Sequence, residues 1–226
     1  MFAVIFTVQP KEGRFEEYLA LAKFLKPELE KIDGFIDNER FGSTRREGRL
    51  LSLSTWRDEK AVIRWRTHAA HHGVQEKGRF EVFDDYHLRV GEITADTQIP
   101  PGQRLQQQRF DETEIADTKF VTISELLPVG DHKPKGNNLA ADLGLPQTAR
   151  EQIVDQEVFE SLYHPGKLLL LVSWPNGGGA GQWTPKESAA GGLRHRHVRI
   201  IRDYGMADRR EAPQYYPPVR GGAARG

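Results

Sequence analysis

The segment RWRTHAAHHGVQEKGR, residues 64–79, gathers side chains that are well suited to chemistry. It holds one tryptophan, three histidines and one glutamate. On one continuous helix, Trp65, His68 and His72 would lie on neighbouring turns of a single face, because they are three and four residues apart. A neutral imidazole accepts a proton near neutral pH. The spacing therefore predicts a general base beside an aromatic wall.

These histidines admit three interpretations. In the first, His68 or His72 is a catalytic base that deprotonates a phenolic substrate, and the electron-rich anion then reacts with oxygen. In the second, His68, His72 and Glu76 bind a metal ion, but the sequence has no HExxH-type context and no second ligand element beside them. In the third, the histidines lie at the surface or at an interface, and Trp65 packs in the core. We carry the first interpretation forward and expect no metal site.

An internal repeat shows which elements must position these residues. GRLLSLSTW at 48–56 returns as GKLLLLVSW at 166–174, which is 118 residues later. The same offset aligns residues 2–65 with 120–183 without a gap, and about a quarter of the positions agree. Agreement over this length indicates a duplication within the chain. The repeated tryptophans of the hairpin are expected to pack in the core, since both copies share them.

Each copy predicts the element order β-α-β-β-α-β. In the first copy, the strands are expected in FAVIFTV, FIDNERFGS, GRLLSLSTW and FDDYHLRVGEI, with helices over residues 13–32 and 58 to about 77. Pro27 predicts a kink or an early end in the first helix. Gly48 and Gly166 mark the hairpin turns. In the second copy, NNLAADLG allows one or two helical turns, and the glycine-rich PNGGGAGQWTPKESAAGG disfavours a regular helix.

This order is typical of a ferredoxin-like α+β unit, in which both helices cover one face of an antiparallel sheet. The other face needs an apolar cover, and the second copy supplies it within the same chain. We therefore expect two ferredoxin-like domains, residues 1–96 and 118–206, that close into an α+β barrel as an internal pseudo-dimer. A polar linker (97–117) joins them, and an extended tail (207–226) follows. A further association of whole chains into a homo-oligomer is compatible with the sequence.

The same residues resemble a known family. The stretch GFIDNERFGSTRREGRLLSLSTWRDEKAVIRWRTHAAHHGVQEKGRFEVFDDYHLRVGEI is similar to the antibiotic biosynthesis monooxygenase superfamily, which has a dimeric α+β barrel fold. The resemblance covers residues 1 to about 94, and in the second copy the hairpin and the closing HVRIIRDYGM. It implies the fold but no single activity, because members include cofactor-free oxygenases of polycyclic phenols, heme-degrading monooxygenases, isomerases and decarboxylases.

The resemblance also bears on cofactors. Heme-degrading members use an Asn on the first strand and a His near the end of the second helix. Here the first strand reads AVIFTV, and Gln75 stands where that His is expected. We therefore expect no cofactor. Heme breakdown is disfavoured, although heme binding through one histidine stays open.

The pocket is expected inside the first copy, where both helices are complete. We expect Trp65, Tyr86 and Phe41 to contact the substrate. Tyr86 and Arg89 lie on opposite faces of the last strand, because strand side chains alternate, and we choose Tyr86 as the pocket residue.

Composition narrows the partners. The 32 basic and 32 acidic side chains cancel without a long run of one sign, so no nucleic-acid partner is expected. No segment approaches the roughly 20 apolar residues of a membrane span, and the first residues fit a strand better than a signal peptide. The chain has no cysteine, which excludes disulfides and thiolate chemistry. A cytoplasmic protein is expected.

The leading hypothesis is a cofactor-independent, monooxygenase-like enzyme that acts on a small aromatic or otherwise hydrophobic molecule. The alternative is a ligand-binding or structural protein that keeps the fold without catalysis. The reduced helices of the second copy favour that alternative.

Overall fold

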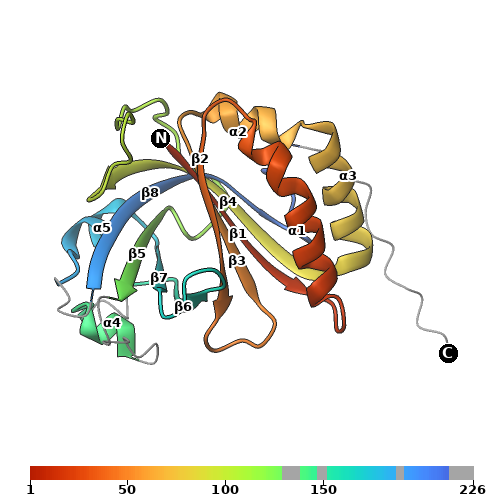
Figure 1. Ribbon diagram of the computed structural model, residues 1–226. Helices are drawn as coiled ribbons and strands as arrows, with labels where there is room; N and C mark the ends of the chain where they lie inside the picture. Colours follow the sequence, from red (N-terminus) through yellow and green to blue (C-terminus); the bar gives the residue numbers. More distant parts are fainter. Residues whose placement is uncertain (129–137, 147–151, 187–190, 214–226) are drawn as a thin grey trace.

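The computed structural model describes residues 1–128, 138–146, 152–186 and 191–213, so most of the expected tail lies outside the described residues. Eight strands are present in this part of the chain (Figure 1). They are β1 (Phe2–Pro10), β2 (Phe35–Ser43), β3 (Leu50–Trp56), β4 (Phe83–Asp96), β5 (Phe120–Pro128), β6 (Asp155–Ser161), β7 (Leu168–Trp174) and β8 (Gly191–Gly205). The helices are α1 (Phe15–Glu30), α2 (Glu59–Arg66), α3 (Ala69–Lys77), α4 (Leu139–Asp142) and α5 (Gly177–Gln182), with a π-helical turn η1 (Gly78–Val82).

The strands form one closed antiparallel barrel in the order β1-β3-β2-β6-β7-β5-β8-β4. Two seams join the halves, β2 with β6 and β4 with β8. Within each half the pairing is equivalent, since Phe2 lies opposite Trp56 and Phe120 lies opposite Trp174. The expected α+β fold of two ferredoxin-like units closed into an intramolecular barrel is confirmed.

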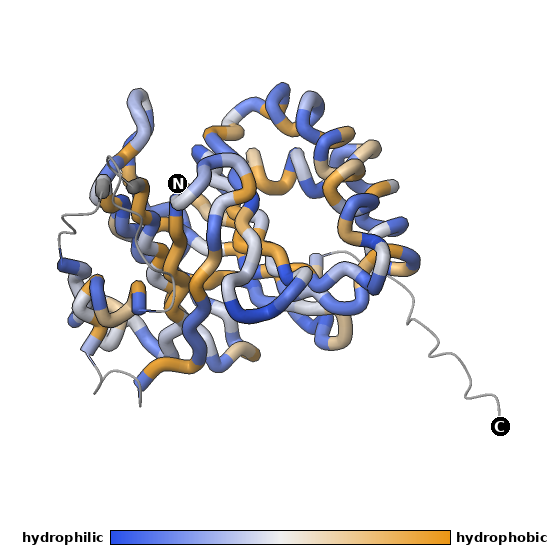
Figure 2. The backbone as a smooth tube through the Cα atoms, turned by 60° about the horizontal axis from the view of Figure 1, so that its bottom comes forward, coloured by the Kyte–Doolittle hydropathy of each residue, from blue (hydrophilic) through white to orange (hydrophobic). Residues whose placement is uncertain are grey.

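Alternation of side chains divides each strand between two environments. One set of residues points into the barrel and fills it, and the other set points outward beneath the helices. The interior cluster is Met1, Ala3, Ile5, Phe41, Leu51, Leu53, Ile93, Val121, Ile123, Phe159, Leu169, Leu171, Val198 and Ile200. The strands at the centre of the molecule are accordingly rich in hydrophobic residues (Figure 2). Both halves share this core, which removes their apolar faces from water.

The hairpin tryptophans pack where the repeat predicts. Trp56 and Trp174 are 0% and 1% exposed. Their indole Nε1 atoms donate to Ser54 Oγ at 2.9 Å and to Thr122 Oγ1 at 3.0 Å, so each buried polar atom is satisfied. The hairpin glycines adopt positive φ angles, as their place in the turns requires.

Three helices cover the outer face of the first half. Helix α1 buries Tyr18, Ala22, Leu25 and Leu29, which are spaced for one face. It runs through Pro27 to Glu30, so the expected early end is wrong. Pro27 sits close to the C-terminal end, where the loss of one backbone hydrogen bond disturbs little of the helix.

The second helix of the first half is broken, contrary to the single helix expected over residues 58 to 77. Asp58 caps α2 by accepting from the amide of Ala61 at 2.8 Å. The helix ends at Thr67, whose hydroxyl donates to the carbonyl of Ile63 at 2.9 Å. His68 is extended (φ −65°, ψ 130°) and starts α3 as its cap residue. The two short helices therefore present different faces from those of one continuous helix.

The described residues of the second half form only short helices, as its sequence suggests. A six-residue helix, α5, does form in the glycine-rich segment, because the side chain of Asn176 caps it by accepting from two glycine amides. Beneath α4 and α5, large side chains fill the outer face of this half, among them Leu139, Leu143 and Trp183. Among the described helices, none has the length and apolar character needed to cross a membrane.

The shared interior predicts that one side chain stabilises both halves. Phe41 is 0% exposed within the barrel, whereas Phe110 is 85% exposed. We expect Phe41→Ala to lower the free energy of unfolding by about 3–5 kcal/mol, because it leaves a cavity in the barrel. Phe110→Ala is the matched control and should change stability by less than about 0.5 kcal/mol. Urea unfolding followed by tryptophan fluorescence measures both, and equal stability of the two variants would contradict a shared core.

Candidate active site

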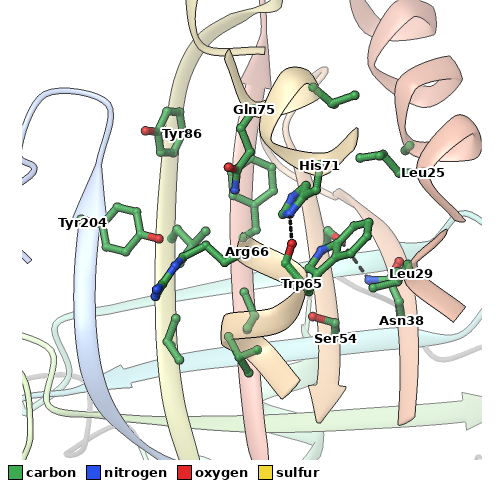
Figure 3. A pocket seen from close by; sticks show the side chains of 18 of the residues that line it. Leu25, Leu29, Asn38, Ser54, Trp65, Arg66, His71, Gln75, Tyr86 and Tyr204 are labelled. Carbon is green, nitrogen blue, oxygen red and sulfur yellow. Dashed lines mark hydrogen bonds between the residues drawn. The ribbon is translucent and has the colours of Figure 1, made fainter. Parts of the chain in front are cut away.

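A cavity of about 200 Å³ lies between the outer face of the first half and the helices α1, α2 and α3 (Figure 3). Its helical wall is mainly apolar. The aliphatic side chains of this wall are Leu21, Ala22, Leu25, Leu29, Val62, Ile63 and Val74. Such a wall suits a small molecule with a sizeable hydrocarbon part.

The strands line the cavity with both apolar and polar side chains. Asn38 and Arg40 of β2 and Ser52 and Ser54 of β3 point toward it. Phe41, expected on the cavity wall, instead belongs to the barrel interior. The physical reason is alternation, because Phe41 follows Arg40 directly and so takes the opposite face of the strand.

Trp65 and His71 form the most distinctive part of the wall. Both line the cavity, and their rings stack with centroids 4.2 Å apart and an interplanar angle of 12°. The Nδ1 atom of His71 lies 2.9 Å from the carbonyl oxygen of Trp65 (Figure 3). A carbonyl oxygen only accepts, so Nδ1 carries the hydrogen and Nε2 carries the lone pair.

Burial sets the charge of His71. Loss of hydration lowers its pKa from 6.5 to about 4, against the opposing effect of the hydrogen bond to Trp65. Neighbouring His68 and His72 lower it further. His71 is therefore neutral at physiological pH and offers Nε2 as a proton acceptor.

The structure places His68 and His72 away from the cavity wall. His68 lies between the two helices, and its Nε2 is 3.8 Å from a carboxylate oxygen of Glu28 on α1. His72 is exposed. The difference from expectation follows from the helix break at Thr67 and His68, which turns the next residues so that His71 stacks on Trp65.

The metal interpretation of these residues has no geometric basis in the described part of the chain. Glu76 is exposed on α3, as is His72. Across the described residues, no group of three or more histidine, aspartate or glutamate side chains is arranged to hold a metal ion.

Tyr86 does line the cavity, and alternation separates it from Arg89 as expected. Its hydroxyl oxygen accepts from the guanidinium groups of Arg79, at 3.1 Å, and Arg209. Arg89 points to the other side and pairs with Asp203 at 2.9 Å.

The second half also contributes to the cavity, which the sequence did not predict. Arg202 and Tyr204 of β8 and the following Arg209 line it. Strand β8 reaches the first half by pairing with β4, where Leu88 lies opposite Tyr204. Burial raises the pKa of Tyr204 to about 12, so its hydroxyl remains protonated and can donate.

Comparison with known proteins identifies the family of the chain. Residues 1–77 match the family model described as antibiotic biosynthesis monooxygenase. A protein of Pyricularia oryzae (strain 70-15), named jasmonate monooxygenase, is 42% identical over 224 residues, which cover 97% of this chain and all of that protein. The chain belongs to the antibiotic biosynthesis monooxygenase family.

Two solved structures align with this antibiotic biosynthesis monooxygenase family member. The crystal structure of an aldoxime dehydratase aligns with 88% of this chain and 80% of its own, with 10% identity and a TM-score of 0.53. The crystal structure of an antibiotic biosynthesis monooxygenase aligns with 40% of this chain and 95% of its own, with 14% identity and a TM-score of 0.37. The first of these indicates a similar fold and nothing about chemistry.

The tautomer and charge of His71 can be tested by NMR. We expect long-range ¹H–¹⁵N spectra to show a neutral ring with hydrogen on Nδ1 from pH 7.5 to 5, since its pKa is about 4. An ordinary histidine titrates through this range, with a midpoint near 6.5. Spectra of His71→Gln identify the signal. A His71 ring that becomes protonated near pH 6.5 would contradict the burial and the hydrogen bond described above.

Proposed function

We propose that the protein is a cofactor-independent monooxygenase that uses His71 as the catalytic base in the cavity beneath α1, α2 and α3. The observation that carries the proposal is the placement of a neutral imidazole, with its Nδ1 hydrogen bound by Trp65, on the wall of a mainly apolar cavity. Membership of the monooxygenase family supports the reaction class.

The substrate is a small, mainly hydrophobic molecule. The aliphatic wall formed by α1 and α2 favours burial of a hydrocarbon part. The relative from Pyricularia oryzae carries jasmonate in its name. Jasmonate is therefore the first compound to test, with anthrone as an aromatic alternative.

The reaction we propose needs no external reductant when an activated CH₂ group is oxidised to a ketone. His71 Nε2 takes one proton from that carbon, and the C–H electron pair stays on the substrate as a stabilised anion. The anion gives its electrons to O₂ and forms a carbon–oxygen bond, and the peroxide anion then takes the proton back from His71. The resulting hydroperoxide loses water as a C=O bond forms and the O–O bond breaks. One CH₂ group and one O₂ thus give one C=O group and one H₂O.

The low pKa of His71 limits the substrates that it can serve. A base whose pKa is about 4 removes protons efficiently only from an acidic position, or from one whose anion the cavity stabilises. Phenolic and carbonyl-activated positions are much weaker acids than the imidazolium form of His71, so the cavity must stabilise the anion that forms at them. Gln75 lies on the cavity wall where heme-degrading relatives have a histidine, which supports a reaction without heme.

Replacement of the base tests the proposal. We expect His71→Gln to reduce kcat by a factor of about 10² to 10⁴, because general base catalysis typically contributes that much. His72→Gln, an exposed histidine on the same helix, is the matched control and should keep full activity. Oxygen uptake and product mass are measured with jasmonic acid and with anthrone, using purified protein without added reductant.

The outcomes separate the alternatives. Equal activity of His71→Gln and the unaltered protein would exclude His71 as the base. Oxygen uptake that requires NADPH, or purified protein that carries bound heme, flavin or metal needed for turnover, would overturn cofactor independence. Ligand binding without turnover under all conditions would support the non-catalytic alternative.

A further inference from the structure

We propose that one end of the cavity is an anion site and that the substrate carries a carboxylate, which arginine and tyrosine side chains bind there. This inference rests on the proposed function, because it concerns the ligand of the same cavity. The sequence predicts a hydrophobic ligand, so the charged end is a separate feature of the site.

The charge of the cavity wall carries the argument. Five of the described lining residues are arginines: Arg40, Arg66, Arg79, Arg202 and Arg209. The carboxylate among the described lining residues is Glu59, and Arg109 already binds both of its oxygens at 2.8 and 2.7 Å. The wall therefore carries a large excess of positive charge. This excess of positive charge favours the entry of an anion.

These arginines come from separate parts of the fold. Arg66 belongs to α2, Arg79 to η1, Arg202 to β8, and Arg209 to the segment that follows β8. Their convergence requires the closed barrel, because β8 brings residues of the second half beside β4. Arg79 and Arg209 also hold the hydroxyl of Tyr86, so part of the cluster is fixed in place before any ligand binds.

The tyrosines add hydrogen-bond donors to the same end. Tyr204 stays protonated, since its pKa is about 12. Arg66 extends toward the side of the cavity where Tyr204 and Tyr86 lie, whereas Leu25 and Leu29 lie on the opposite side beneath α1 (Figure 3). Donors at one end and aliphatic groups at the other match an amphipathic acid. Guanidinium groups suit a carboxylate in particular, because two N–H groups can bind both of its oxygens.

This arrangement also determines where Trp65 and His71 lie relative to a bound acid. Trp65 and His71 lie between the arginine end and the leucines of α1 (Figure 3). A ligand whose carboxylate is held by Arg66 would therefore lay its hydrocarbon part across the indole and imidazole rings. The anion site thus orients the substrate and keeps its acidic group away from the base.

The test compares an acid with its neutral ester. Jasmonic acid and methyl jasmonate are titrated into the full chain at pH 7.5, with cinnamic acid and methyl cinnamate as a second pair, and binding is followed by calorimetry. We expect each acid to bind at least about tenfold more tightly than its ester, since a desolvated charge pair is worth more than 1.4 kcal/mol. The preference should shrink as salt is raised.

Two arginines of the same helix provide the variants. Arg66→Met should remove most of the preference for the acid while leaving ester binding within about threefold, because the aliphatic wall is retained. Arg64→Met is the control, since Arg64 is exposed and binds Asp33 at the surface. Arg66→Lys should restore part of the preference through its charge.

Each result decides the proposal. Esters that bind as well as the acids, an Arg66→Met variant that weakens acid and ester alike, or no binding by either pair would overturn the anion site. Acid-selective binding without oxygen-dependent turnover would keep the anion site and reject the proposed monooxygenase reaction. The two hypotheses therefore fail on different measurements.

Discussion

Closure of the barrel is the constraint on which the rest of the structure depends. Once eight strands close, every inward side chain joins a common interior, and that interior is filled by residues such as Phe41 and Phe159 with 0% exposure. A filled interior leaves no room for a ligand there. A functional cavity must then lie on an outer face, beneath helices. In the second half that space is occupied by Trp183, Leu139 and Leu143, whereas the longer helices of the first half leave a cavity open.

The same closure makes the two halves unequal in function. Strand β8 is long enough to pair with β5 through its first part and with β4 through its last part. Its end therefore supplies Arg202 and Tyr204 to a cavity whose other walls belong to the first half. The second half is more than a cover for an apolar sheet, because it provides the polar end of the site. A separate first half would keep Trp65 and His71 but lose part of the charge that faces them.

Sequence patterns predicted those features that depend on short-range periodicity. Alternation separated Tyr86 from Arg89, and Tyr86, the one chosen as the pocket residue, lines the cavity. The repeat placed Trp56 and Trp174 in the core. The same alternation, applied to β2, puts Phe41 in the barrel interior, away from the substrate. The choice among the histidines required the position of the helix break, which the sequence pattern does not show. No proline or glycine marks the break at Thr67, so the spacing of one continuous helix pointed to His68 and His72 instead of His71. The sequence could not predict the arginine cluster, because Arg66 and Arg202 line one cavity only through the pairing of β4 with β8.

Binding of an acid in the positively charged cavity would change how readily His71 accepts a proton. Burial disfavours the imidazolium ion, and the neighbouring His68 and His72 add to that penalty, so His71 resists protonation. A bound carboxylate offsets part of the positive charge, which makes a proton on Nε2 less costly. The arginines that remain near the substrate also stabilise a second negative charge as it develops on the reacting carbon. Under the proposed reaction, the anion site would thus make His71 a stronger base only after the acid has bound, and proton removal would be coupled to the presence of the substrate.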